Sequence, residues 1–249
     1  MSAAILQLQG VHTHIGAYHI LHGVDFEAPT GQVTMLLGRN GAGKTTTLRT
    51  IMGLWAASRG QVVFDGQAIG GDKAQRRTPD IAQLGIAYVP ENMGIFSDLT
   101  VRENLLLAAR DARTVEQMDT QRLEWLFGLF PAIRKFWLYP AGKLSGGQKQ
   151  MLAICRALVE PRRLLLIDEP SKGLAPAIVQ NLIAALRELK RTQTTVLLVE
   201  QNFAMARALG DQVAVMDDGR VVHRGAMAEL AGDEALQHKL LGLSLGAHQ

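Results

Sequence analysis

Short apolar runs alternate with helical patterns along most of this 249-residue chain. Four runs are rich in aliphatic residues, and they occupy residues 32–37, 86–89, 164–167 and 195–199. Apolar runs of this length are typical of strands that are buried on both faces, and such strands are mostly parallel. The pattern therefore predicts an α/β fold with a mostly parallel core sheet.

The first third of the chain has a different pattern. Residues 6–8 and 21–26 alternate apolar and polar positions, and residues 61–66 look like a further strand that ends in a turn. Half-buried strands of this kind predict an antiparallel β subdomain near the N-terminus. Two polar stretches, residues 70–73 and 76–79, predict a loop after it.

The middle of the chain predicts helices, because no strand pattern occurs between residues 100 and 160. Apolar residues follow helical spacing in residues 101–110, 121–130 and 147–158. Residues 228–241 predict a short helical appendage of undecided role. We expect one domain over residues 1–249, made of a catalytic core (1–91 and 159–225), an inserted helical subdomain (92–158) and a C-terminal helical tail (226–249).

Composition narrows the function classes. The formal net charge is only +3, and aromatic residues make up 5% of the chain, so we expect no nucleic-acid partner. Cys155 is the only cysteine, which excludes an internal disulfide and fits the cytoplasm. No stretch approaches the roughly 20 apolar residues that span a bilayer, so any action at a membrane requires a partner.

A phosphate-binding loop follows the first predicted core strand. Residues 38–45, GRNGAGKT, match the pattern GxxxxGK[ST] and lie between that strand and a helical pattern. Glycines let backbone N–H groups surround phosphate oxygens, and a helix N-terminus adds positive potential. Lys44 is predicted to reach the β and γ phosphates of ATP, and the Thr45 hydroxyl to ligate Mg²⁺. The predicted nucleotide-binding residues of this loop are Gly38, Asn40, Gly41, Gly43, Lys44, Thr45 and Thr46.

Two carboxylates end the apolar run at residues 164–167. Asp168 and Glu169 follow it directly, at the C-terminal end of a predicted strand, where α/β sheets place their ligands. Asp168 is predicted to hold Mg²⁺, directly or through water. Glu169 is predicted to be the general base for a water that attacks the γ-phosphate, and Lys44 is also assigned to catalysis. Beside the phosphate loop, these roles are favoured over a helix cap or a solvated turn.

A second anion site is predicted at residues 144–148, which read LSGGQ. An amphipathic run follows, so these residues form a helix N-terminus with free N–H groups and a hydroxyl. Because one loop already holds the phosphates within this chain, a second phosphate reader suggests a nucleotide gripped between two chains. The residues assigned to it are Ser145, Gly146, Gly147 and Gln148.

The phosphate loop, the LSGGQ signature and the acidic strand end occur in the order found in ABC transporter ATPases, which the sequence resembles over nearly its whole length. The resemblance implies a P-loop NTPase cassette and a head-to-tail dimer, in which the signature of one subunit acts on the ATP of the other. It also implies that the helical subdomain docks onto a membrane permease and that the segment around Glu91 transmits closure. Glu91, Thr45 and Asp168 are the expected metal ligands. Whether the second ATPase subunit is identical or only related stays open.

Finer matches resemble the LivF-type ATPases of branched-chain amino acid importers. These matches lie in residues 88–91, 95–105, 150–158, 168–176 and 198–202. The resemblance implies uptake of branched-chain or related hydrophobic amino acids at the cytoplasmic face of the inner membrane, with permease subunits and, indirectly, a periplasmic or extracellular binding protein. Glu91 stands where urea and short-chain amide importers usually have Gln. Urea or amide import, lipid or lipopolysaccharide export and a non-transport ABC ATPase are the alternatives.

Several positions depart from the usual ABC pattern. Gln201 stands where most members carry His, and it is predicted to act in catalysis as a γ-phosphate sensor without a positive charge, or merely to cap a strand end. Lys172 follows Ser171 where an apolar residue is common. The ring that stacks on adenine is usually near the position of Ile15. This chain has no ring there, so Tyr18 is the predicted stacking residue and Ile15 the alternative.

Four histidines cluster within the first 22 residues of the chain, namely His12, His14, His19 and His22. Such a cluster raises the question of a metal site. No Cys or carboxylate framework accompanies it, so a solvated edge strand is favoured.

Overall fold

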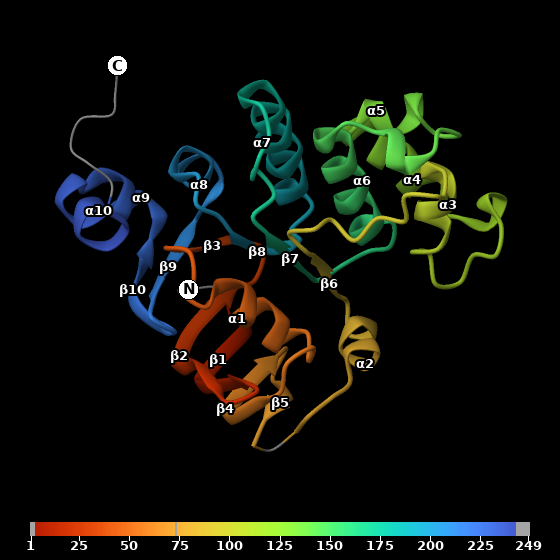
Figure 1. The fold of residues 1–249 in the computed structure, drawn as a ribbon. Coiled ribbons are helices and arrows are strands. Elements are labelled where there is room, and N and C mark those ends of the chain that lie inside the picture. Colours follow the sequence, from red (N-terminus) through yellow and green to blue (C-terminus); the bar gives the residue numbers. More distant parts are fainter. Residues whose placement is uncertain (1–2, 73, 243–249) are drawn as a thin grey trace.

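The computed structural model of the protein describes residues 3–72 and 74–242. Within these residues the strands form an antiparallel sheet near the N-terminus and a mostly parallel sheet in the middle of the molecule (Figure 1). The first sheet has the order β2 (Tyr18–Pro29), β1 (Ala4–Ile15), β4 (Ala57–Phe64) and β5 (Gln67–Gly71). The second has the order β10 (Arg220–Ala226), β9 (Gln212–Asp217), β3 (Val33–Gly38), β8 (Thr195–Val199), β7 (Leu164–Asp168) and β6 (Ile86–Val89). The predicted α/β class is confirmed.

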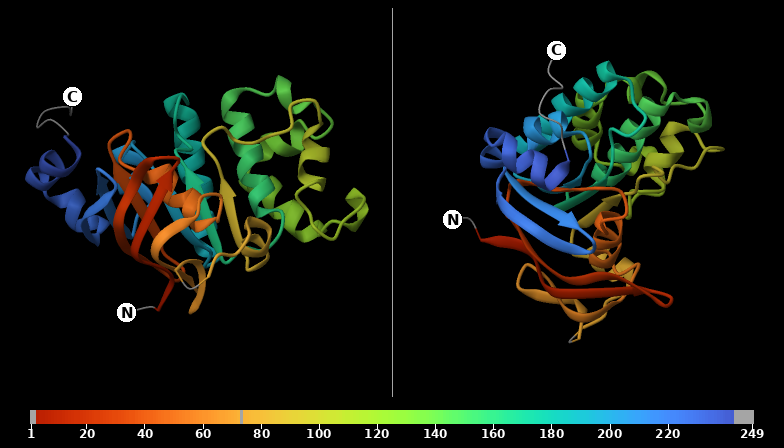
Figure 2. Two further views of the ribbon diagram at one scale, coloured as in Figure 1. Left: turned by 60° about the horizontal axis from the view of Figure 1, so that its bottom comes forward. Right: turned by 60° about the vertical axis from the view of Figure 1, so that its left-hand side comes forward.

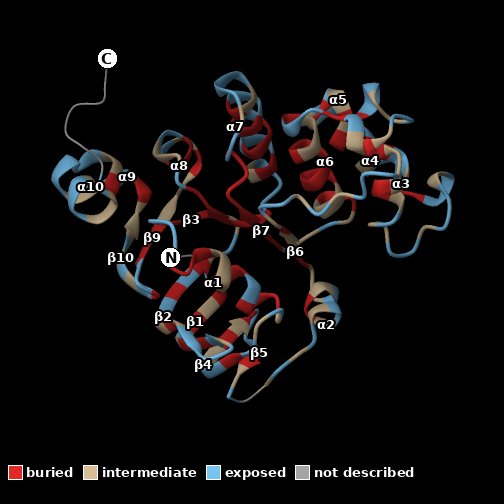
Figure 3. Cartoon of the chain, viewed as in Figure 1, coloured by how far each residue is buried: buried red, intermediate tan, exposed pale blue. Residues whose placement is uncertain are grey.

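The core sheet is buried because apolar layers cover both of its faces. Strands β9, β3, β8, β7 and β6 pair in parallel, and β10 pairs antiparallel with β9 at the edge. Alternate residues of β3 meet opposite layers, since Leu36 belongs to the cluster of the N-terminal sheet and Met35 and Leu37 belong to the cluster of the helices. Figure 3 shows these central strands as buried.

Amphipathic spacing explains the helices that cover the core sheet. In α7 (Pro176–Arg191), Pro occupies the first helical position, and Val179, Ile183 and Leu186 are buried at spacings of three and four residues. Outside residues 92–158, the other helices are α1 (Lys44–Ile51), α2 (Thr78–Gln83), α8 (Phe203–Leu209), α9 (Met227–Gly232) and α10 (Glu234–Leu241).

Residues 92–158 lie between β6 and β7 and form a helical region. Its helices are α3 (Val101–Leu106), α4 (Thr120–Leu129), α5 (Pro131–Lys135) and α6 (Gly146–Leu158), with short 3-10 turns at Val115–Gln117 and Ala141–Lys143. Thr100 and Glu103 form a capping box that starts α3. Figures 1 and 2 show this region at the opposite end of the molecule from α9 and α10. The proposed division into core, helical subdomain and tail stays a prediction.

The predicted loop at residues 70–73 and 76–79 was wrong in part. Gly70 and Gly71 belong to β5, because the β4–β5 hairpin continues past its turn and pairs them with β4. Residues 78–79 open α2, since Pro is tolerated in the first turn of a helix and Ile81 buries its side chain beneath it. Lys73 lies outside the described residues.

Two other predictions need adjustment at their ends. The helical pattern at residues 101–110 forms a helix only as far as Leu106. The appendage at residues 228–241 is two helices, because Asp233 ends α9 and its side chain caps α10. Residues 243–249 of the predicted tail lie outside the described part. Across residues 3–72 and 74–242, none of the helices has the length and apolarity needed to cross a membrane.

Candidate nucleotide-binding site

The phosphate loop joins β3 to α1, and its geometry demands glycine at two positions. Gly38 and Gly43 have φ values of 144° and 96°, which L side chains rarely adopt. A Cβ on Gly38 would lie 2.2 Å from the carbonyl oxygen of Met216, and one on Gly43 would lie 2.9 Å from Leu21 Cδ2. The backbone conformation disfavours a side chain at both positions, and at Gly38 the backbone of Met216 also leaves no room for one, so the loop can curl tightly enough to present its N–H groups.

Lys44 supplies a buried positive charge to this loop. Its Nζ donates to the carbonyl oxygens of Gly38 and Arg39 at 2.9 and 3.0 Å, and it lies 3.6 Å from Glu169 Oε1. The side chain is only 4% exposed. A buried ammonium needs such partners. The two carbonyl groups keep Lys44 Nζ beside the phosphate loop, where it can reach a bound phosphate.

Asp168 and Thr45 form a donor set suited to Mg²⁺. Asp168 Oδ1 accepts a hydrogen bond from Thr45 Oγ1 at 3.1 Å, and Oδ2 accepts one from the Tyr88 hydroxyl at 3.2 Å. Burial raises the pKa of Asp168, and the negative charges of Glu169 and Glu91 raise it further. A buried carboxylate among other carboxylates favours a cation, and Mg²⁺ is commonly held by one or two carboxylates together with substrate phosphates. These residues therefore fit the metal.

The predicted base and sensor are in direct contact. Gln201 Nε2 donates to Glu169 Oε1 and to Asn40 Oδ1, both at 2.6 Å. Glu169 is a non-glycine residue with φ of 45°, and its N–H donates to the carbonyl of Val199 at 2.9 Å. Such strained backbone persists only where its surroundings fix it, and it is common at functional sites. The side chain of Gln201 thus links the phosphate loop to the acidic strand end.

Glu91 and Lys172 are further residues that line the phosphate pocket. The pocket around the phosphate loop has a volume of about 370 Å³, and it is lined by Ile20, Asn40, Gly41, Gly43, Lys44, Thr45, Thr46, Glu91, Glu169 and Lys172. Lys172 Nζ lies 2.5 Å from Glu91 Oε1 and 3.8 Å from Glu169 Oε2. The structure therefore brings most of the predicted phosphate and metal residues to one place.

Glu200 is a site residue that the sequence reasoning missed. It is 1% exposed, and its carboxylate accepts hydrogen bonds from the N–H and Oγ of Ser171 and from the N–H groups of Gln201 and Asn202, at 2.9 to 3.1 Å. It ties the loop after β7 to the loop after β8. The available signal was an acidic residue directly after an apolar strand, the pattern that identified Asp168.

The LSGGQ residues do not join the phosphate pocket within this chain. Ser145 and Gln148 form a reciprocal capping box at the start of α6, and a Cβ on Gly147 would lie 2.6 Å from Ile178 Cγ2. Neither these residues nor Gly146 line the pocket around Lys44. Figure 1 shows α6 in the helical region and α1 between the two sheets.

Tyr18 lies at the turn of the β1–β2 hairpin and is 76% exposed. The hairpin residue that lines the phosphate pocket is Ile20. Stacking of Tyr18 or Ile15 on adenine stays a prediction.

The nearby histidine rings pack against one another, with centroids 4.1 Å apart for His14 and His19 and again for His19 and His22. His12 Nδ1 lies 3.0 Å from His19 Nε2. Burial and the neighbouring rings lower the pKa of His19. In the described part of the chain, no three His, Cys, Asp or Glu side chains are arranged to hold a metal ion.

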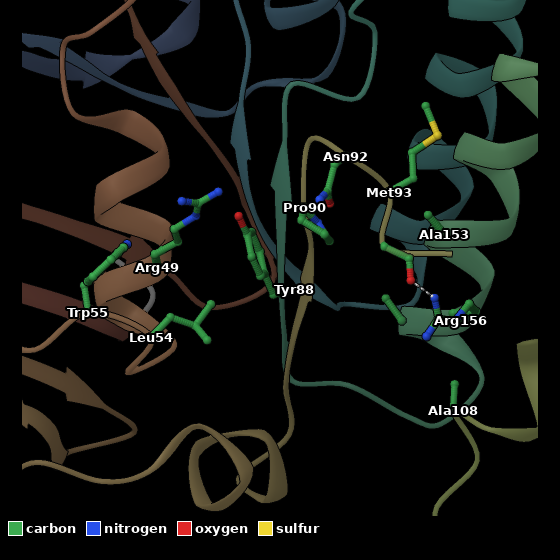
Figure 4. Close-up of a pocket in the computed structure, with 12 residues that line it drawn as sticks. Arg49, Leu54, Trp55, Tyr88, Pro90, Asn92, Met93, Ala108, Ala153 and Arg156 are labelled. Carbon is green, nitrogen blue, oxygen red and sulfur yellow. Dashed lines mark hydrogen bonds between the residues drawn. The ribbon is translucent and has the colours of Figure 1, made fainter. Parts of the chain in front are cut away.

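A second cavity lies between α1 and α6, with a volume of about 630 Å³ (Figure 4). Arg49, Trp55 and Tyr88 line one wall, and Met93 and Arg156 line the other. Trp55 Nε1 and Arg156 Nε are buried and, in the described structure, have no hydrogen-bond partner.

Comparison with known proteins gives a consistent picture. Residues 21–172 match the family model for ABC transporters. The chain is 38% identical to the high-affinity branched-chain amino acid transport ATP-binding protein BraG of Pseudomonas aeruginosa, with 96% of this chain and 100% of that protein covered. It is 36% identical to the probable branched-chain amino acid transport ATP-binding protein LivF of Archaeoglobus fulgidus, over 90% of this chain and 93% of that one.

Solved structures share the fold. An ATP-binding subunit of an ABC transporter aligns with a TM-score of 0.77 and 30% identity, covering 97% of this chain and 96% of that one. An ABC transporter cassette in its ADP conformation aligns with a TM-score of 0.80 and 24% identity, over 97% of this chain and all of that chain.

Proposed function

The chain belongs to the ABC transporter family, and from that premise we propose that it is the ATP-hydrolysing subunit of an importer for branched-chain or related hydrophobic amino acids. As a member of that family it is an ATPase cassette. The observation that carries the proposed cargo is the match with BraG, because 38% identity extends over the whole of that relative. A cassette subunit does not itself contact the cargo, so the site supports the chemistry and the relative supports the substrate class.

The site supports hydrolysis of ATP by positioning and charge neutralisation. Glu169 accepts a proton from a water molecule, the water oxygen attacks the γ-phosphorus, and the bond to the β–γ bridging oxygen breaks to give ADP and phosphate. Lys44 neutralises charge on the β and γ phosphates, and Gln201 hydrogen-bonds the γ-phosphate. Thr45, Asp168 and Glu91 would hold Mg²⁺, which would supply further neutralisation of the phosphate oxygens.

ABC ATPases work as dimers together with membrane permease subunits, and we propose that Ser145 to Gln148 act on the nucleotide of the partner ATPase. Support comes from the helix start at Ser145, because residues 145–148 begin α6 and do not line the phosphate pocket of their own chain. The variant Ser145→Arg should abolish hydrolysis while the isolated subunit still binds nucleotide. Loss of both would argue against action across the dimer.

We place the permease contact at the cavity between α1 and α6. Its volume of about 630 Å³ and its lining, where Met93 and Ala157 lie beside Arg49 and Arg156, support a helix of the permease as the occupant. Ala157→Trp would fill the cavity and should prevent co-purification with permease subunits while nucleotide binding is unchanged. Ala228→Trp makes the same change on the exposed face of α9 and should leave the complex intact. Retained assembly in Ala157→Trp would contradict this placement.

Transport by cells tests the cargo. Cells that lack this subunit should lose uptake of labelled leucine, the intact chain should restore it, and Lys44→Ala should not. Restored uptake of urea instead of leucine would assign the subunit to urea or amide import. The proposal also puts the subunit at the cytoplasmic face of the membrane, with a second ATPase subunit, identical or related, and an external binding protein as its further partners.

A further inference from the structure

Lys172 is a charged residue of the phosphate pocket to which the proposed mechanism gives no role. It lies in the turn after β7, where its own backbone N–H donates to the carbonyl of Glu169 at 3.2 Å. Its ammonium lies 2.5 Å from Glu91, which comes from the segment after β6, and 3.8 Å from Glu169. The side chain therefore joins two acidic residues that reach the pocket from different strands.

Three carboxylates lie close together at this pocket, and the ammonium of Lys172 offsets part of their negative charge when nucleotide is absent. Asp168, Glu169 and Glu91 interact electrostatically, because the charges of the two glutamates act on Asp168. Lys44 approaches Glu169 and is bound to loop carbonyls. In the described part of the pocket lining, Lys172 is the cation that contacts Glu91. A phosphate that enters this pocket meets those carboxylates, and the repulsion is smaller while Lys172 is paired with them.

Lys172 is also free to move. Its side chain is 58% exposed, and Glu91 is 42% exposed. Ion pairs at this level of exposure are weak, since water solvates both partners. The pair can therefore open when a stronger cation or anion enters, whereas Lys44 at 4% exposure is fixed.

We propose that Lys172 is a mobile counter-charge for Glu91 and Glu169 that gives way when Mg²⁺ and nucleotide bind. This inference rests on the ATP-binding part of the proposed function and not on the cargo. It predicts that Mg²⁺ and Lys172 compete for Glu91, because Mg²⁺ must displace the ammonium from that carboxylate. It also predicts that Lys172 favours binding of metal-free ATP, because it lowers the repulsion between the carboxylates and the phosphates.

The test is equilibrium binding of a fluorescent ribose-labelled ATP, with EDTA and with increasing MgCl₂. Lys172→Ala should weaken metal-free binding by roughly 5- to 10-fold, as expected for one lost charge near a solvated site. The affinity at saturating MgCl₂ should change far less. The MgCl₂ concentration that gives half of the increase in affinity should fall. Lys172→Arg keeps the charge and should restore the behaviour of the intact protein. Lys190→Ala removes a lysine paired with Asp211, outside the pocket, and should change neither value.

A double-mutant cycle with Glu91→Gln isolates the proposed contact. In the Glu91→Gln background, the loss of metal-free affinity caused by Lys172→Ala should shrink, because the main carboxylate that it compensates has been neutralised. Equal loss with and without MgCl₂, or the same loss in both backgrounds, would overturn the role of Lys172. A native chain that binds no nucleotide under either condition would instead overturn the proposed function. Melting temperatures of all variants show that each is folded.

Discussion

Replacing Glu169 by Gln separates its role in chemistry from its role in binding. The substitution keeps the size of the side chain and removes the carboxylate that lies 3.6 Å from Lys44 Nζ and accepts from Gln201. A general base contributes about 10²- to 10⁴-fold to a rate, which corresponds to roughly 3 to 5 kcal/mol of transition-state stabilisation. Hydrolysis should fall by that factor.

Nucleotide binding should survive the same substitution. Two charges about 4 Å apart interact by at most ~4 kcal/mol at an effective dielectric constant of about 20, and Lys44 keeps its two carbonyl partners. The repulsion between Glu169 and the γ-phosphate disappears, so affinity for ATP should be equal or higher, and dimers should accumulate with ATP.

The assays for Glu169→Gln are phosphate release at saturating Mg²⁺–ATP, titration with labelled ATP, and size-exclusion chromatography. Glu188→Gln is a matched control, because Glu188 lies on α7 and pairs with Arg191 at the surface. Turnover of Glu169→Gln within twofold of the intact protein would refute the assignment of Glu169 as the base.

Three further predictions follow from single residues. Tyr18→Ala should raise the KM for ATP about fivefold or more if the exposed ring stacks on adenine, and an unaltered KM would return that role to Ile15 or to neither residue. Gly38→Ala should abolish ATP binding and lower the melting temperature by several degrees, since its φ of 144° and the 2.2 Å approach to Met216 leave no room; normal binding would contradict this geometry. Cys155 is 0% exposed and burial raises the pKa of its thiol, so iodoacetamide should modify it only after unfolding; fast labelling of the native chain, followed by mass spectrometry, would show that α6 opens.

Local sequence identified the parts of the candidate site that one segment builds alone. The phosphate loop could be predicted because strand, glycines, lysine and helix are contiguous, and the tight curl at Gly38 is a property of that segment. Asp168 could be predicted for the same reason, as it ends a fully buried strand. The capping boxes at α3 and α6 are local in the same sense, because each joins residues three positions apart.

Contacts between distant segments could not be predicted in this way. Glu91 and Lys172 are 81 residues apart, and Asn40 and Gln201 are 161 residues apart, yet each pair is in hydrogen-bond contact. The strand order explains both, because β8 inserts between β3 and β7, and β6 adds next to β7. The loops at the ends of these parallel strands meet at one edge of the sheet only once that order is set.

The sequence by itself therefore determined the class of fold, the phosphate loop and the acidic strand end, since each depends on residues close together in the chain. Only the tertiary structure decided that Gln201 bridges Asn40 and Glu169, that Glu200 fixes two loops, and that Lys172 rests on Glu91. Those contacts arise because the core sheet places strands side by side in an order that differs from their order in the chain.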